Sequence, residues 1–100
     1  MKKIIILIPV FNDWESLIKL IKEINEIIKD YNSVHFECLI VNDASTINQP
    51  NLVKPNNIKS LQILNMKKNK GHARCNAFGI RYVFKNKEFN NLILMDGDGE

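Results

Sequence analysis

Two apolar runs, separated by an amphipathic segment, constrain the fold more than any other feature of the sequence. Residues 3–10 and 36–41 are mostly apolar and rich in β-branched side chains, as in strands that are buried on both faces. Between them, apolar residues recur at helical spacing over residues 13–29. A strand, a helix and a second strand of these lengths form a unit in which the strands are parallel and the crossover is right-handed. The sequence therefore predicts a parallel sheet.

The second half of the chain repeats this order after a loop. Residues 47–59 contain several asparagines and two prolines, which predicts a loop with at most one helical turn. Residues 60–65 alternate like a strand near the sheet edge, a second helix is expected to open at residues 69–72, and a fourth strand is expected over residues 92–95. The predicted fold class is α/β, a Rossmann-like, open, mainly parallel sheet of about four strands with flanking helices. The 100 residues, 45% of them hydrophobic, fit one domain with one modest core.

Both predicted helices carry signals that locate their ends or their packing faces. Asn12, with Glu15 three residues later, has the capping-box pattern and would begin the first helix, while Trp14 in the first turn would pack against the core. Gly79 lies inside the second helix, where glycine costs about 1 kcal/mol relative to alanine, so close packing against the sheet is the expected reason for it. The apolar positions expected to share one face of that helix are Ala73, Ala77, Ile80 and Phe84.

Charge and composition restrict the partners and the compartment. The formal net charge of +3 is too small to indicate nucleic-acid binding, so no nucleic-acid partner is expected. Residues 54–87 nevertheless contain nine basic and no acidic residues, a segment that either faces phosphate or forms a solvated basic surface. Cys38 and Cys75 have neither disulfide nor zinc spacing, so both are expected to be packing residues in a reduced, cytoplasmic setting. No run approaches the ~18 apolar residues of a membrane span, so membrane contact is expected only at the surface or through parts outside these residues.

Polar residues follow three of the expected strands at the points where the strands end. If the second and fourth strands flank the first, then residues 9–12, Asp43 and residues 96–100 line one crevice at the carboxyl ends of the strands. Ligands bind at this edge in open α/β sheets. Asp43 and the hydroxyls of Ser45 and Thr46 are suited to a base or a ribose, and the alternative is an N-cap cluster that starts a short helix.

Residues 96–100, with the sequence Asp-Gly-Asp-Gly-Glu, are the candidate metal site. Asp96, Asp98 and Glu100 occupy alternate positions, so their side chains would point the same way from an extended segment. Carboxylate oxygens are the ligands that Mg²⁺ and Mn²⁺ prefer in proteins. One alternative is a turn at the sheet edge, which Asp-Gly also favours, and another is a calcium-binding loop, which would need a helix before it.

The start of the second helix is a candidate anion site. Lys70 and Gly71 lead into this helix, and a helix N-terminus approached in this way attracts negative charge. His72 at the same point is expected to be an exposed turn residue rather than a catalytic one.

Four segments, taken together, resemble the successive motifs of the family 2 glycosyltransferases with the GT-A fold. They are residues 6–12 (Ile-Leu-Ile-Pro-Val-Phe-Asn), 39–46 (Leu-Ile-Val-Asn-Asp-Ala-Ser-Thr), 69–77 (Asn-Lys-Gly-His-Ala-Arg-Cys-Asn-Ala) and 92–100 (Leu-Ile-Leu-Met-Asp-Gly-Asp-Gly-Glu). In this order and spacing they span essentially the whole chain. The Gly-His-Ala segment and the acidic ending are most similar to the polyprenyl-phosphate sugar transferases of the dolichyl-phosphate mannose synthase type. One departure is Asn42, where the family often has a second aspartate.

The resemblance implies a role for each candidate residue. Asp43 matches the acid that hydrogen-bonds the nucleobase, and residues 9–12 match the loop that flanks the nucleotide. Asp96 and Asp98 match the DxD motif, whose carboxylates bind a divalent cation, Mg²⁺ or Mn²⁺, that bridges the donor diphosphate. The implied nucleotide-binding residues are Pro9, Val10, Phe11, Asn12, Asp43, Lys70, Arg74, Asp96 and Gly97, and the implied metal ligands are Asp96, Asp98 and Glu100.

The resemblance also implies a glycosyltransferase that takes a sugar from a UDP or GDP sugar and passes it to a polyprenyl phosphate or a cell-surface glycan. The chain is expected to be the N-terminal, nucleotide-sugar-binding half of a GT-A domain, cytoplasmic, able to form homo-oligomers and peripheral to a membrane in a full-length form. The general base is expected beyond these residues, so the isolated chain is expected to be inactive. The alternatives are a sugar-phosphate nucleotidyltransferase, which would carry a glycine-rich loop with arginine at residues 9–13, and a non-catalytic nucleotide- or calcium-binding module.

Overall fold

The computed structural model describes residues 1–96 and shows one four-stranded sheet with two helices. The strand order is β3-β2-β1-β4, and all three pairings between neighbouring strands are parallel. This arrangement confirms the α/β fold class, and it meets the condition on which the predicted crevice depends, because the first strand lies between the second and the fourth. The elements are β1 (Lys2–Val10), α1 (Trp14–Ile28), β2 (Val34–Asn42), β3 (Ser60–Asn65), α2 (His72–Asn86) and β4 (Asn91–Leu94).

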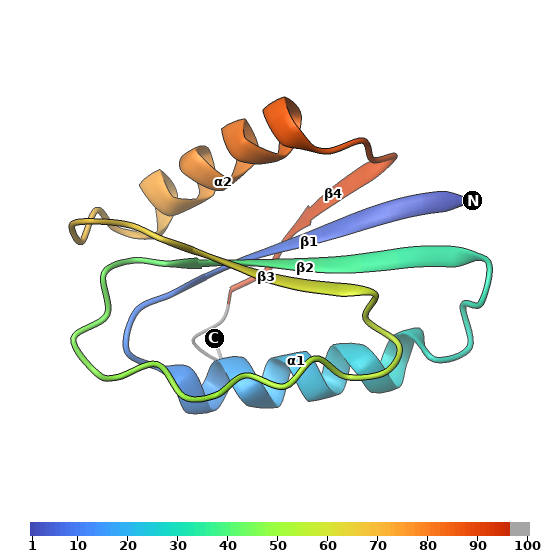
Figure 1. Cartoon of the computed structure of the whole chain (residues 1–100), viewed down its shortest axis with the longest axis horizontal. Helices are drawn as coiled ribbons and strands as arrows, with labels where there is room; N and C mark the ends of the chain where they lie inside the picture. Colours follow the sequence, from blue (N-terminus) through green and yellow to red (C-terminus); the bar gives the residue numbers. More distant parts are fainter. Residues whose placement is uncertain (97–100) are drawn as a thin grey trace.

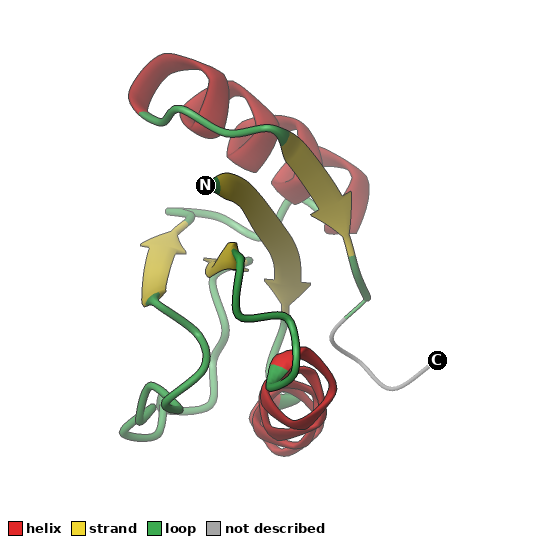
Figure 2. Cartoon of the chain, turned by 90° about the vertical axis from the view of Figure 1, so that its right-hand side faces the viewer, coloured by secondary structure: helices red, strands yellow, loops and turns green. Residues whose placement is uncertain are grey.

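The molecule has three layers, with the sheet between the two helices (Figures 1 and 2). α1 covers one face, and the loop of residues 43–59, which contains no helix, runs along it (Figure 1). Asn57 fastens this loop because its backbone N–H donates a 2.8 Å hydrogen bond to the side-chain oxygen of Asn25. α2 covers the other face and connects β3 to β4, so the two crossovers lie on opposite sides of the sheet (Figure 1).

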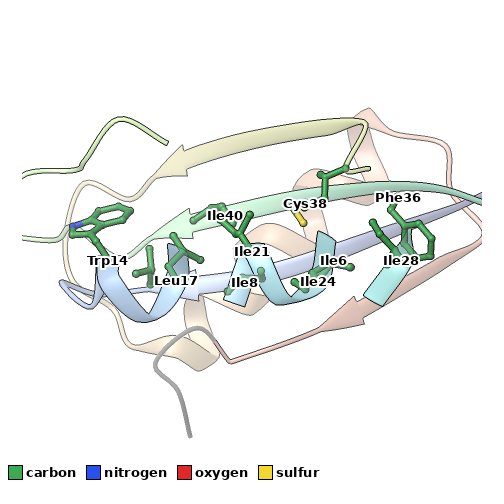
Figure 3. Close-up of a cluster of buried hydrophobic side chains, with 12 residues drawn as sticks. Ile6, Ile8, Trp14, Leu17, Ile21, Ile24, Ile28, Phe36, Cys38 and Ile40 are labelled. Carbon is green, nitrogen blue, oxygen red and sulfur yellow. The ribbon is translucent and has the colours of Figure 1, made fainter. Parts of the chain in front are cut away.

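The α1 face of the sheet holds the larger core. Every third or fourth residue of α1 is buried, as the helical spacing predicted, and Trp14 is among them at 5% exposure. Burying a large apolar side chain contributes about 1.5–3 kcal/mol, so this row of side chains is a main source of stability. Figure 3 shows the cluster of Ile6, Ile8, Trp14, Leu17, Ile21, Ile24, Ile28, Phe36, Cys38 and Ile40.

The expected packing face of α2 is wrong, because the buried residues are Cys75, Gly79 and Val83. The reason is the close approach of the helix to the sheet. A Cβ atom added at Gly79 would lie 2.5 Å from Cδ1 of Leu7, which confirms that this glycine permits close packing. Of the positions expected to face inward, Ile80 is half-buried, whereas Ala73, Ala77 and Phe84 are exposed.

The predicted N-cap of α1 is also wrong by one residue. The N-cap is Asp13, whose carboxylate accepts a 3.3 Å hydrogen bond from the backbone N–H of Ser16. Asn12 instead adopts a left-handed conformation with φ of 63°, which asparagine tolerates better than most residues. Its side chain is therefore turned away from the helix and toward the loop that follows β2.

Two further expectations concern the cysteines and the membrane. Cys38 and Cys75 are buried free thiols, as predicted for packing residues. Burial raises the pKa of Cys38 to about 12, so this thiol stays protonated at neutral pH. Within residues 1–96, neither helix combines the length and the apolar character that crossing a bilayer requires.

Candidate nucleotide and metal site

The site is built where three parallel strands end together. β1 lies between β2 and β4, and Val10 is the register partner of Asn42. Asp43 extends this pairing because its backbone N–H donates a 2.8 Å hydrogen bond to the Val10 carbonyl. On the other side of β1, the backbone N–H of Met95 donates a 3.0 Å hydrogen bond to the Leu7 carbonyl. The backbone thus brings the residues after β1, β2 and β4 to one edge of the sheet.

Asn12 ties the turn after β1 to the loop after β2. Its side-chain oxygen accepts hydrogen bonds from the backbone N–H groups of Thr46 (2.7 Å) and Ile47 (2.9 Å). Its own backbone N–H donates a 2.9 Å hydrogen bond to the Ser45 hydroxyl. The hydroxyls of Ser45 and Thr46 therefore belong to this link, and they do not start a short helix, because residues 43–59 contain none.

Asp43 is fully buried, with 0% exposure, and its carboxylate binds the start of α2. One carboxylate oxygen accepts a 2.7 Å hydrogen bond from the backbone N–H of Lys70. The other accepts hydrogen bonds from the Gly71 backbone (2.9 Å) and the Asn69 side-chain amide (3.1 Å). These are charge-assisted bonds at a helix N-terminus, where a negative charge is favoured. The nucleobase contact expected of Asp43 stays a prediction, and in this structure its oxygens bind the chain itself.

Gly71 and Cys75 are two further residues that shape the entrance to α2. Gly71 has φ of 88°, a conformation that glycine adopts readily and other residues rarely do. Cys75, one turn into α2, has its pKa raised to about 12 by burial and by its hydrogen bond to the Asp43 carboxylate and that group's charge. Cys75 is therefore a neutral thiol that packs beneath the carboxylate.

His72 and Asn76 form a second cluster with the chain after β4, which the sequence analysis missed. His72 Nδ1 lies 3.6 Å from Oδ1 of Asp96, so this histidine contacts the first acid of the predicted metal site instead of standing alone in a turn. A hollow of about 200 Å³ is lined by both helix residues together with Pro9 and the residues 94–96. The side-chain oxygen of Asn76 is buried and has no hydrogen-bond partner among residues 1–96. The only sequence signal for this cluster is the spacing of four between His72 and Asn76, which places them on one side of the helix.

Lys70 and Arg74 lie elsewhere on the surface. They are exposed and line an open groove of about 300 Å³ together with Met66 and Phe78. This groove shares no lining residue with the hollow beside Asp96. Their predicted contact with the donor phosphates therefore stays a prediction.

The metal site falls largely outside the described residues, because Gly97, Asp98 and Glu100 follow residue 96. Within residues 1–96, no group of three His, Cys, Asp or Glu side chains is arranged to hold a metal ion. Asp96 and Asn76, two residues that line the same hollow, both carry hard oxygen donors of the kind that Mg²⁺ and Mn²⁺ accept. The chemistry of these two residues fits the predicted ion.

Comparison with known proteins identifies the family. A family model described as glycosyl transferase family 2 matches residues 5–100, which include all the candidate site residues. The search of curated proteins found no match, and neither did the search of solved structures. On the strength of the family match, the chain belongs to glycosyl transferase family 2.

Proposed function

We propose that this chain holds the nucleotide-diphosphate sugar donor of a glycosyltransferase at the carboxyl ends of β1, β2 and β4. Family membership supports the general class of reaction. The observation that carries the proposal is the strand order, because β1 lies between β2 and β4 and so brings Asn12, Asp43 and Asp96 to one edge of the sheet. Ligand sites of open α/β sheets are found at this kind of edge.

The diphosphate is proposed to lie beside Asp96, and the nucleobase toward Asp43 and the turn of residues 9–12. Asp96, Asp98 and Glu100 would hold Mg²⁺ or Mn²⁺. When bound, such an ion supplies positive charge that stabilises the developing charge of the diphosphate leaving group. His72, 3.6 Å from Asp96, would orient that carboxylate. Asp43 would act mainly as a positioning residue, since its carboxylate holds residues 69–71 at the entrance to α2.

The finer assignment concerns the acceptor. The resemblance to the dolichyl-phosphate mannose synthase type supports a polyprenyl phosphate, and a cell-surface glycan is the second candidate. Transfer to a glycan hydroxyl needs a carboxylate that removes the hydroxyl proton, whereas Asp43 is engaged with α2 and Asp96 is assigned to the metal. A polyprenyl phosphate is already ionised and needs no such base. We therefore expect these 100 residues to bind a donor without measurable sugar transfer to a hydroxyl acceptor.

Calorimetric titration with UDP and with GDP, each with and without Mn²⁺, tests the proposal. We expect metal-dependent binding of one nucleotide, and loss of that binding in the Asp98→Ala variant. Asp30→Ala, an exposed acid after α1, is the matched control and should bind like the wild type. Binding without metal dependence would favour a plain nucleotide-binding module. Absence of binding under all conditions, or sugar transfer to a hydroxyl acceptor by the isolated chain, would contradict the proposal.

A further inference from the structure

α2 turns toward solvent a face that carries cations and aromatic rings but no acid. Phe78, Arg81 and Lys85 are three and four residues apart, and Phe84 lies three residues after Arg81, so the four share one broad side of the helix; all are exposed. Phe78 is 37% exposed and Phe84 is 69% exposed. The whole of α2 contains no Asp or Glu. We call these four residues the outer face of α2.

The charge of the outer face continues into two neighbouring grooves. The groove of about 300 Å³ already described is lined by Arg81 and Phe78, and a second, of about 460 Å³, is lined by Phe78, Lys67 and Lys68. Met66 lines both of them and adds an apolar surface. A continuous region of the surface therefore combines cations with apolar side chains.

The position of Phe84 is supported by a neighbour. Its ring stands edge-on to the ring of Phe89, with centroids 5.1 Å apart and an interplanar angle of 84°. Phe89 packs against the core on the α2 side of the sheet. The Phe84 ring is thus held at the surface while most of it stays exposed to water, so a partner that covered it would remove apolar surface from water.

α1 provides the comparison within the same molecule. Its exposed positions include Lys19 and Lys22, but Glu15, Glu23 and Glu26 lie on the same helix. α1 therefore carries both signs of charge, three acids and two cations, as on an ordinary solvated helix. The outer face of α2 carries cations alone, so charge complementarity points to an anionic partner.

We propose that the outer face of α2 docks on an anionic lipid bilayer. A helix that lies in the bilayer surface places aromatic side chains at the boundary of the acyl chains and lysine and arginine at the anionic headgroups. Phe78 and Phe84 would insert, while Arg81 and Lys85 would bind headgroups. Phe78 lines both grooves, but the more exposed Phe84 lines neither. Single-stranded nucleic acids bind in grooves in which successive rings stack on the bases, so a bilayer, which also accommodates a ring outside a groove, fits this face better. The inference does not depend on donor binding, because none of these four residues is assigned to the donor site.

Vesicle co-sedimentation without nucleotide tests the inference on the whole chain. We expect binding to vesicles of phosphatidylcholine mixed with phosphatidylglycerol, little binding to phosphatidylcholine alone, and weaker binding at high salt. Replacing both cations (Arg81→Gln with Lys85→Gln) should weaken binding about thirtyfold, since each cation near an anionic surface contributes about fivefold. Phe78→Ser with Phe84→Ser should also weaken vesicle binding relative to the wild type. This loss should be largest at high salt, where the insertion of the rings contributes most of the binding.

Matched variants on α1 provide the controls. Lys19→Gln with Lys22→Gln removes the same amount of charge, and Ile27→Ser removes an apolar side chain that is 68% exposed. Both should bind vesicles like the wild type, and circular dichroism should show that every variant is folded. Failure to bind anionic vesicles, equal losses in the α1 variants, or tighter binding of a single-stranded RNA oligonucleotide with the same dependence on Phe78 and Phe84 would overturn the inference. The Phe78→Ser, Phe84→Ser variant should bind UDP or GDP like the wild type. A loss of vesicle binding in this variant can therefore be distinguished from a failure of donor binding.

Discussion

α1 and α2 have the same length, 15 residues each, and cover opposite faces of one sheet, yet they are attached to it in different ways. α1 buries five large apolar residues and begins with a local cap, Asp13. α2 buries one cysteine, one glycine and one valine, and the residues that lead into it are bound by Asp43, a buried aspartate that follows β2. The helix with the smaller apolar core is therefore the helix whose position depends on polar contacts at the site.

This difference between the two helices separates the part of the fold that provides stability from the part that forms the candidate site. The α1 side provides most of the buried apolar surface and takes little part in the candidate site. The α2 side begins at Asp43, carries His72 toward Asp96 and ends in an exposed face of unbalanced charge. Substitutions on the two sides should therefore separate effects on folding from effects on binding.

Leu17→Ala should have the largest effect on folding. Leu17 is 0% exposed in the α1 core, and removing a buried leucine side chain costs about 3 kcal/mol in the free energy of unfolding. Donor affinity should be unchanged under conditions in which the variant is folded. Chemical denaturation measures the loss, and Ile27→Ala at an exposed position of the same helix should stay within about 0.5 kcal/mol of the wild type. Equal losses at the two positions would contradict the role given to the α1 core.

Asp43→Asn should affect both folding and binding. The substitution removes the charge that accepts the backbone N–H groups of Lys70 and Gly71, at a cost of about 2 kcal/mol. Because the entrance to α2 would loosen, donor affinity should fall as well, unlike in Leu17→Ala. Denaturation and calorimetry on the same samples check both effects. A variant that keeps full stability but loses binding would show instead that Asp43 contacts the nucleobase directly and does little to hold α2.

Gly79→Ala tests the close approach of α2 to the sheet. Alanine favours a helix by about 1 kcal/mol over glycine, but here the added Cβ would lie 2.5 Å from Leu7 Cδ1. Overpacking of this kind costs about 1–3 kcal/mol, so we expect a net destabilisation of about 1 kcal/mol. A gain in the midpoint of denaturation would mean that α2 sits farther from the sheet than described. Leu7→Ala makes room for the added methyl group. In that background, Gly79→Ala should increase the free energy of unfolding instead of lowering it.

The pH dependence of stability tests the attachment at the other end of α2, where Lys87 contacts Glu37 of β2. Partial burial raises the pKa of Glu37, but hydrogen bonds from Lys3, His35 and Lys87 outweigh it and leave the pKa below its ordinary value of 4.5. A depressed pKa in the folded state means that the stabilisation is present above the unfolded-state value and is lost as the pH falls through the folded-state value. Thermal unfolding of Glu37→Gln should therefore depend less on pH below about 4.5 than that of the wild type. An identical acid dependence in both proteins would exclude this contribution.

Much of the fold follows from patterns that depend on neighbours along the chain. The two buried strands and α1 follow from apolar periodicity, and the parallel pairing follows from the crossover, whereas the order of the strands entered the sequence analysis only as a condition. The packing face of α2 could not be predicted, because the helix buries its smallest side chains and only the distance to Leu7 explains the choice of Gly79. Apolar periodicity alone predicts that Phe84 faces the sheet, whereas in the structure Phe84 is exposed to solvent.

For the candidate site, the sequence predicted where the residues lie along the sheet better than it predicted which side chains they contact. The edge shared by Asn12, Asp43 and Asp96 follows from topology alone. The hydrogen bonds of Asp43 to residues 69–71 and the contact of His72 with Asp96 depend on how the second crossover returns to the sheet, over separations of 24 or more residues. No local pattern in the sequence encodes such distances.

The most direct test of the donor site is paramagnetic broadening of the backbone amide signals by Mn²⁺ in the presence of UDP or GDP. Because broadening falls steeply with distance from the ion, the signals of His72, Met95 and Asp96 should be lost first, followed by those of Asn12 and Asp43. Signals at the amino ends of the strands, such as Lys3 and Phe36, should be retained. Broadening centred at that opposite edge, or spread evenly over the chain, would contradict a donor site at the carboxyl ends of β1, β2 and β4.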